Sequence, residues 1–205
     1  METQNNGIAT KPLIDQAIEY NILVKSPSQT QTPLQIVCFF DFEKNQHYQG
    51  GTDAVNQHFS GEIDSLRRKG IFKGDFLETL LIIPKRSQIP AQKLLLVGLG
   101  DPLALSFDSL EKVGYYTFLE AQKLKVDSFC FAPSLKDAGV SLPEGLAVSK
   151  ALPMGMSRAV AATRMLAEQN LGDEVSVQKI FLLAGEAQAS HAYDGLFQAF
   201  GNTQN

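Results

Sequence analysis

Residues 93–133 decide the fold, and they read KLLLVGLGDPLALSFDSLEKVGYYTFLEAQKLKVDSFCFAP. Residues 93–97 and 126–132 are short runs dense in Leu, Val and Phe, as in strands that are covered on both faces. Residues 106–125 lie between them with apolar side chains near the 3.6-residue period of an amphipathic helix, at Leu110, Val113, Thr117, Ala121 and Leu124. A helical crossover between two buried strands predicts a largely parallel or mixed sheet.

The same alternation continues on both sides of this stretch. We expect further strands at residues 34–40, 78–83 and 177–184, and a more weakly patterned strand within 14–24. We expect one helix that ends before Gly70 and another that covers 187–200. Between them we expect a helical region from about residue 143 onward, which Pro153 divides. The predicted fold class is α/β, a three-layer α/β/α arrangement with a mixed, largely parallel sheet. We predict that residues 1–33 form a tail with a first strand and a loop, and that 34–205 form a single α/β domain.

Two smaller predictions concern the ends of these elements. Asp53 or Ser60 is a candidate N-cap for the helix that ends near Arg67-Arg68-Lys69. The loop 133–143 is expected to hold at most a short helical turn.

Composition limits the class of protein. The chain has 205 residues, 44% of them hydrophobic, which is enough for one sizeable core, and its net charge of −4 argues against nucleic-acid binding driven by net charge. Cys38 and Cys130 lie inside apolar runs, so we expect buried, inert thiols. The polar N-terminus lacks the apolar core of a secretory signal, and no window approaches the ~20 apolar residues of a membrane span. We therefore expect a soluble, cytoplasmic protein.

Two short motifs are candidate anion sites. Gly98-Leu99-Gly100 follows a predicted strand and precedes a helix, where glycines let backbone N–H groups approach a phosphate. Leu103 occupies the position of the third fingerprint glycine, and Asp101 would repel a phosphate, so a plain turn is the favoured interpretation. Ser157 and Arg158 lie near a predicted helix start and are a second candidate, but a helix start flanked by packing methionines is the favoured interpretation.

Catalytic and metal motifs are missing from the sequence. The histidines are His47, His58 and His191, which are far apart and lack the HExxH spacing of zinc ligands. No serine stands in a GxSxG elbow. We therefore predict no catalytic residue, no metal ligand and no cofactor.

Basic residues gather in Arg67-Arg68-Lys69, Lys73 and Lys85-Arg86. Such a cluster is able to contact a phosphate backbone or an acidic partner. A solvated helix end, whose cations complement the helix dipole, is the favoured interpretation.

A longer stretch carries a family resemblance. It combines Lys73-Gly74, the run Glu78-Thr79-Leu80-Leu81 closed by Pro84, and Leu95-Leu96-Val97-Gly98-Leu99-Gly100. In this order and spacing, after Gly50-Gly51, the stretch resembles the N-terminal domain of the leucyl aminopeptidase family. The resemblance implies a mixed sheet between helices, similar in shape to macro domains.

In that family the peptidase chemistry, with two metal ions, belongs to a separate C-terminal domain. The resemblance therefore implies a stand-alone, non-catalytic relative that acts in protein interaction, oligomer assembly or regulation, with no peptidase activity of its own. The implied partners are a second copy, another protein or a separate aminopeptidase catalytic chain; nucleic acid and membranes are not expected partners. One alternative is a macro-like module that binds ADP-ribose or a nucleotide near Gly98, Gly100, Ser157 and Arg158. Another is the regulatory half of a split metallo-aminopeptidase.

Overall fold

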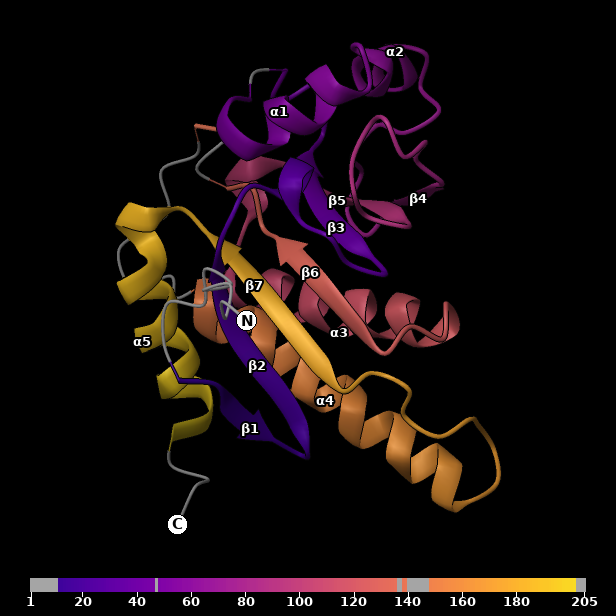
Figure 1. The fold of residues 1–205 in the computed structure, drawn as a ribbon, viewed down its shortest axis with the longest axis vertical. Coiled ribbons are helices and arrows are strands. Elements are labelled where there is room, and N and C mark those ends of the chain that lie inside the picture. The colour runs from indigo at the N-terminus through magenta and orange to yellow at the C-terminus, as the bar shows by residue number, and fades with distance from the viewer. Residues whose placement is uncertain (1–10, 47, 136–137, 140–147, 202–205) are drawn as a thin grey trace, which may run out of the picture.

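The computed structural model describes residues 11–46, 48–135, 138–139 and 148–201, in which a seven-stranded sheet is covered by helices on both faces (Figure 1). The strands are β1 (Leu13–Asp15), β2 (Ile18–Val24), β3 (Gln35–Phe40), β4 (Thr79–Ile82), β5 (Leu94–Gly100), β6 (Ser128–Ala132) and β7 (Lys179–Ala184). The helices are α1 (Gly50–His58), α2 (Glu62–Arg68), α3 (Phe107–Lys123), α4 (Val148–Glu168) and α5 (Ala189–Phe200).

The strand order is β1-β2-β7-β6-β3-β5-β4. The pairs from β2 to β5 are parallel, whereas β1 and β4 pair antiparallel to their neighbours at the two edges. Helical crossovers connect the parallel strands, as the 93–133 pattern predicts. The α/β fold class with a mixed, largely parallel sheet is confirmed.

The sheet separates two apolar cores. Ile36 and Cys38 of β3 face the core shared with α3, α4 and α5, while Val37 and Phe39 face the core shared with α1 and α2. This alternation follows from the two-residue period of a strand. All residues of β3 and β5 are buried, so these strands lie at the centre of the fold.

Two local predictions are wrong at helix ends. The helix expected before Gly70 is two helices, because Ser60 and Gly61 adopt φ values of 54° and 78° and interrupt the chain between α1 and α2. Consequently Gln49 and Gly61 occupy the N-cap positions, in place of Asp53 or Ser60. This break lets Phe59 and Ile63 both enter the same core.

Pro153 does not divide a helix, because α4 runs through it without interruption. Proline removes one intrahelical hydrogen bond and disfavours a helix interior. Here Leu152 and Met156 on either side of it are buried in the core with α3, and this packing outweighs the local preference. Tertiary burial thus overrides the proline signal.

Two further expectations change in the structure, and a third lies largely outside the described residues. The strand expected within 14–24 is the β1–β2 hairpin, since Gln16 and Ala17 have positive φ values of 46° and 57° and form a tight turn. Strand β4 is an edge strand with exposed Thr79 and Leu81, instead of a strand covered on both faces. The loop predicted at 133–143 lies largely outside the described residues.

Candidate functional site

The carboxyl ends of β2, β7 and β6 open onto a groove of about 980 Å³. In open parallel sheets, ligands bind at this edge because the loops that follow the strands diverge there. The described residues that line the groove come from the β2 end (Val24, Lys25, Ser26, Pro27), the start of α1 (Gly50, Gly51), the β6 end (Phe131, Ala132, Pro133, Ser134, Leu135), the start of α4 (Val148, Ser149, Leu152), the β7 end (Leu182, Leu183, Ala184, Gly185, Gln188) and α5 (His191, Ala192, Asp194, Gly195, Gln198).

The groove combines apolar and polar walls. Phe131, Leu182 and Leu152 are buried core residues beneath the groove, and the partly buried Val24, Ala184 and Ala192 give it an apolar surface. Polar groups stand on α5, where His191 and Asp194 line the groove. An apolar surface with a few converging polar groups is typical of a small-molecule site.

The start of α1 supplies an electropositive end to this groove. Gly50 and Gly51 form the first turn of α1, and the side chain of the N-cap residue Gln49 makes no capping hydrogen bond. Backbone N–H groups at a helix start and the helix dipole both favour an anion. Lys25, which lines the groove just after β2, adds a positive charge. The groove is therefore suited to a ligand with an anionic group.

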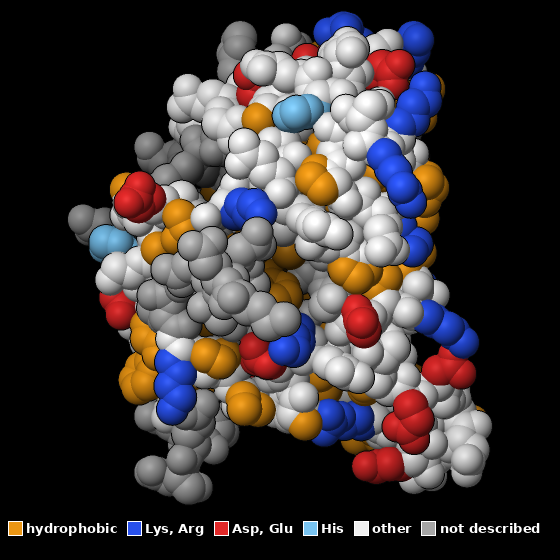
Figure 2. Space-filling view, in the orientation of Figure 1, with side chains coloured by type: hydrophobic (Ala, Val, Ile, Leu, Met, Phe, Trp, Pro, Cys, Tyr) orange, Lys and Arg blue, Asp and Glu red, His pale blue; other side chains and the backbone are white. Residues whose placement is uncertain are grey.

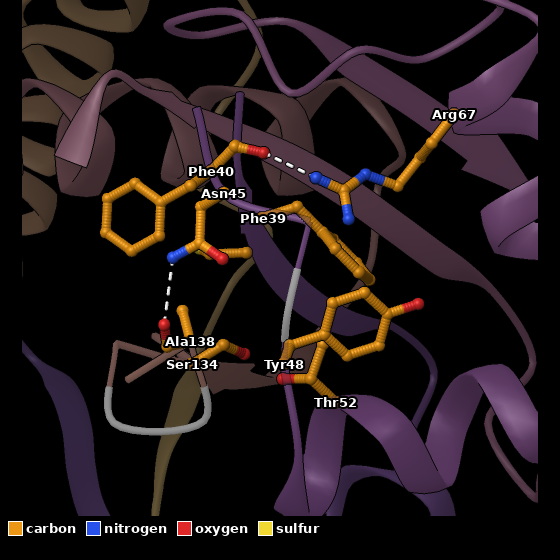
Figure 3. Close-up of a pocket in the computed structure, with 9 residues that line it drawn as sticks. Phe39, Phe40, Asn45, Tyr48, Thr52, Arg67, Ser134 and Ala138 are labelled. Carbon is orange, nitrogen blue, oxygen red and sulfur yellow. Dashed lines mark hydrogen bonds between the residues drawn. The ribbon is translucent and has the colours of Figure 1, made fainter. Parts of the chain in front are cut away.

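Arg67 supplies a second positive charge next to α1 (Figure 3). Its side chain leaves the last turn of α2, is only 2% exposed and donates from Nη2 to the Phe40 carbonyl oxygen at 2.6 Å. The guanidinium carbon lies 5.0 Å from the ring centre of Phe39 and 5.6 Å from that of Tyr48. Burial lowers the pKa of Arg67, although Tyr48 and neighbouring acids act in the opposite direction. The solvated helix end that we expected at Arg67 is thus a buried, aromatic-lined cation.

A cavity of about 10 Å³, the size of one water molecule, lies beside this guanidinium and is lined by Thr52 of α1 and by Ser134. Ser134 also lines the large groove. Nε and Nη1 of Arg67 have no hydrogen-bond partner among the described residues. The cavity and the groove therefore adjoin at Ser134, with the arginine behind the start of α1.

Tyr48 and Asp64 hold α1 and α2 in this arrangement. The Tyr48 hydroxyl donates to the Asp64 carboxylate, and burial together with this hydrogen bond raises the pKa of Tyr48. Asn56 of α1 donates to the same carboxylate at 3.1 Å and accepts from the Asp64 backbone N–H at 3.2 Å. These contacts hold α2, and with it Arg67, against α1.

Gly98 and Gly100 lie within β5 instead of in a turn after it. A side chain at Gly98 would meet the Asp75 carbonyl oxygen at 1.9 Å, and one at Gly100 would meet Phe76 at 3.0 Å. Because glycine has no side chain, the segment that precedes β4 packs directly against β5 at these two positions. Neither glycine is among the residues that line the groove.

Ser157 and Arg158 lie in the middle of α4, away from the groove lining. The Ser157 hydroxyl donates to the Asp15 carboxylate at 2.6 Å, which joins α4 to the β1–β2 hairpin. Arg158 forms an ion pair of 3.2 Å with Glu111 of α3. Helix α4 starts before Pro153, so these residues are not at a helix start, and a ligand role for the four predicted residues stays a prediction.

Sequence reasoning missed the groove residues Gly50, Gly51 and Lys25. The Gly-Gly pair stands between a predicted buried strand and a predicted helix. That position was a usable signal, because backbone N–H groups at such a junction are accessible to an anion.

Both cysteines are free and buried, as predicted. Burial raises the pKa of the Cys130 thiol to about 11 and that of Cys38 further. In the described part of the chain, no group of three or more His, Cys, Asp or Glu side chains is placed to hold a metal ion. None of the described helices is long and apolar enough to span a bilayer.

Comparison with known proteins identifies the family. The model of the cytosol aminopeptidase family, N-terminal domain, matches residues 36–148, more than half of the chain. The chain belongs to this family. A probable cytosol aminopeptidase of Roseiflexus castenholzii is 39% identical over 69 residues, and one of a Sulfurihydrogenibium species is 25% identical over 119 residues. The aligned parts cover 34% and 58% of this chain but only 14% and 23% of these relatives.

Solved structures show the same fold. A tomato leucine aminopeptidase mutant superimposes with a TM-score of 0.62 at 15% identity, over 91% of this chain and 37% of that one. An Oceanobacillus iheyensis macrodomain mutant with ADPR superimposes with a TM-score of 0.65 at 10% identity, over 92% of this chain and 97% of that one. The likeness to macro domains that the resemblance implies is therefore confirmed for the fold.

Proposed function

We propose that this domain binds a small molecule with an adenosine diphosphate group, of the ADP-ribose class, in the groove at the carboxyl ends of β2, β7 and β6. The observation that carries the proposal is a groove of about 980 Å³ that meets the start of α1 at Gly50-Gly51 beside Lys25. Small-molecule sites commonly enclose roughly 300–1,000 Å³. The macrodomain neighbour with ADPR supports the ligand class, because it shares the fold.

The groove offers a separate surface to each part of such a ligand. The diphosphate is placed at the start of α1, where Lys25 and the backbone N–H groups balance its charge. The buried Arg67 behind α1 adds to the positive potential there. The adenine ring is placed against the partly buried apolar side chains of Val24, Ala184 and Ala192, which line the groove.

Gly185 offers a direct test of this site. It lines the groove, has an ordinary φ of −69°, and a Cβ atom built on it would meet no atom within 4 Å. Gly185→Leu is therefore expected to fill part of the groove with little strain on the backbone. Ala187→Leu, two residues further on at an exposed position outside the groove lining, is the matched control.

Isothermal titration with ADP-ribose measures the effect. The unmodified chain and Ala187→Leu are expected to bind, and Gly185→Leu is expected to bind at least tenfold more weakly. Absence of heat with the unmodified chain at millimolar ligand removes the proposal. Equal affinity for all three proteins moves the site away from the groove.

A second function is also proposed for this domain: a non-catalytic role through protein contacts, in oligomer assembly or in regulation of a separate aminopeptidase catalytic chain. The relatives support a link to aminopeptidases, because the stretches that align with this chain belong to two probable cytosol aminopeptidases. Exposed Ile71, Leu81 and Ile83 also offer an apolar contact surface. As the relatives are named cytosol aminopeptidases, we place this function in the cytoplasm.

Two measurements test the second function. The chain alone, with Mn²⁺ or Zn²⁺, is expected not to hydrolyse leucine p-nitroanilide. Mixed with a separately expressed cytosol aminopeptidase catalytic domain, it is expected to co-elute in size-exclusion chromatography. Metal-dependent turnover by the chain alone, after removal of contaminating peptidases, contradicts the non-catalytic role.

A further inference from the structure

The outer edge of β4 is an exposed apolar strand. β4 is the last strand of the sheet, and no described strand pairs with its outer side. Leu80 and Ile82 pack on the core with α1 and α2, whereas Leu81 is 41% exposed and Ile83, just after the strand, is 67% exposed. An exposed edge with apolar side chains is a template on which another strand adds.

The backbone of this edge is also unpaired toward solvent. Gly98 of β5 donates its N–H to the Glu78 carbonyl oxygen at 2.8 Å. Because hydrogen-bonded and non-hydrogen-bonded residues alternate along an antiparallel pair, Leu80 and Ile82 turn their N–H and C=O groups toward β5. The backbone groups of Thr79 and Leu81 consequently face outward.

Positive charge surrounds this edge. Residues 68–86 hold five Lys and Arg against two Asp and Glu, a net charge of +3 in a chain whose total is −4. The Glu78 carboxylate accepts the backbone N–H groups of Lys73, Gly74 and Asp75, which leaves Asp75 as the exposed acid. Figure 2 shows Lys and Arg side chains beside hydrophobic ones along the border where α2 and β4 lie in Figure 1. The exposed basic side chains are Arg68, Lys69, Lys73, Lys85 and Arg86.

We infer that this edge binds an extended, acidic segment of a partner protein, which adds a strand to β4. The inference rests on the second proposed function and names its contact surface. The outward backbone groups of Thr79 and Leu81 would hydrogen-bond the added strand, Leu81 and Ile83 would contact its apolar side chains, and the surrounding cations would bind its carboxylates.

Two other occupants fit this edge less well. A nucleic acid matches the cations, but it has no peptide groups to pair with the backbone of Thr79 and Leu81 and it leaves Ile83 uncovered. A second copy pairing through its own β4 would bring two sets of cations together, and the repulsion between like charges disfavours such pairing.

The test uses a fluorescein-labelled decapeptide of alternating glutamate and valine, titrated with the full chain in a fluorescence-anisotropy assay. Leu81→Pro removes the outward N–H, and a proline is tolerated on an edge strand at such a position. Lys85→Glu/Arg86→Glu reverses two of the cations. Lys112→Glu, at an exposed position on α3, is the control for charge reversal elsewhere on the surface, and circular dichroism verifies that each variant is folded.

The unmodified chain and Lys112→Glu are expected to bind the peptide, more weakly as salt increases. Leu81→Pro and the double reversal are each expected to bind about tenfold more weakly. Absence of binding, or binding unaffected by folded Leu81→Pro, overturns the inference. If a DNA oligonucleotide binds more tightly than the peptide, and Leu81→Pro does not change its affinity, the edge is assigned to nucleic acid. If the unmodified chain forms a dimer that dissociates in the Leu81→Pro variant, the edge is assigned to a second copy. If the Leu81→Pro variant co-elutes with a catalytic domain as the unmodified chain does, β4 is not the contact surface, while the second proposed function stands.

Discussion

Gly155→Ala tests the closest approach of two helices in this fold. Gly155 of α4 faces Gly114 of α3, and a methyl group built on Gly155 would lie 1.9 Å from the Glu111 carbonyl oxygen and 2.9 Å from the Tyr115 nitrogen. A methyl group on Gly114 would lie 2.1 Å from the Leu152 carbonyl oxygen. The atoms it would meet belong to helix backbone, so no side-chain rotation relieves the overlap.

The cost follows from these distances. Since ordinary contact begins near 3.4 Å, the helices would separate by about 1.5 Å, which forfeits much of the dispersion energy at the interface. Overpacking of this kind costs typically 1–3 kcal/mol, and we take about 3 kcal/mol because the obstacle is backbone. Alanine recovers about 1 kcal/mol of helix propensity relative to glycine. The expected net loss is about 2 kcal/mol, or a decrease in Tm of about 4–8 °C for a chain of this length.

Urea denaturation followed by circular dichroism measures this loss. Gly185→Ala is the matched control, because its methyl group meets no atom within 4 Å and its φ of −69° suits alanine. That variant is expected to gain about 0.4–1 kcal/mol through the unfolded chain. A Gly155→Ala protein as stable as the unmodified chain would refute the close packing of α3 on α4, and with it the position of the α4 start at the groove.

Two further predictions concern buried polar groups. Because burial raises the pKa of Cys130 to about 11, the native state keeps a proton that the unfolded thiol releases above about pH 8.5. Stability is therefore expected to hold below that pH and to fall as the pH rises toward 11. Urea midpoints at pH 7 and 10 measure the slope, which Cys130→Ala is expected to reduce and Cys38 to maintain in part, and a midpoint that rises with pH contradicts the assignment. Arg67→Met is expected to change the unfolding free energy by less than about 1 kcal/mol, because it retains the packing volume and removes a buried cation with two unpartnered nitrogens. Arg67→Ala leaves a cavity between Phe39 and Tyr48 and is expected to cost about 3 kcal/mol, so the opposite order in a denaturant titration contradicts this account.

The groove illustrates where sequence reasoning stops. The apolar runs of β6 and β7 could be identified as buried strands, because their side chains carry the strand signal locally. No local sequence pattern shows that β2 pairs with β7, because the two strands are more than 150 residues apart in the chain. The groove exists because of that pairing, so its residues could not be gathered from their spacing.

Glycines and prolines show the same division at single positions. Gly98 and Gly100 were interpreted as a turn, yet they lie in β5 because the chain before β4 passes within contact distance of them. Pro153 was interpreted as a helix boundary, yet it lies inside α4, whose neighbouring Leu152 and Met156 are buried. In each case the residue type indicated a local backbone preference correctly, but contacts with distant segments determined the secondary structure in which the residue lies.

The sequence by itself determined the alternation of strands and helices, the largely parallel sheet, the buried thiols and the family, because periodicity and motif order are properties of neighbouring residues. Only the tertiary structure decided which strands form the edges and that Arg67 is buried whereas Arg68 and Lys69 are exposed. It also decided that Gly50, Lys25 and Gly185 meet at one groove. The physical reason is that burial and charge proximity depend on contacts between segments far apart in the chain, which no local pattern encodes.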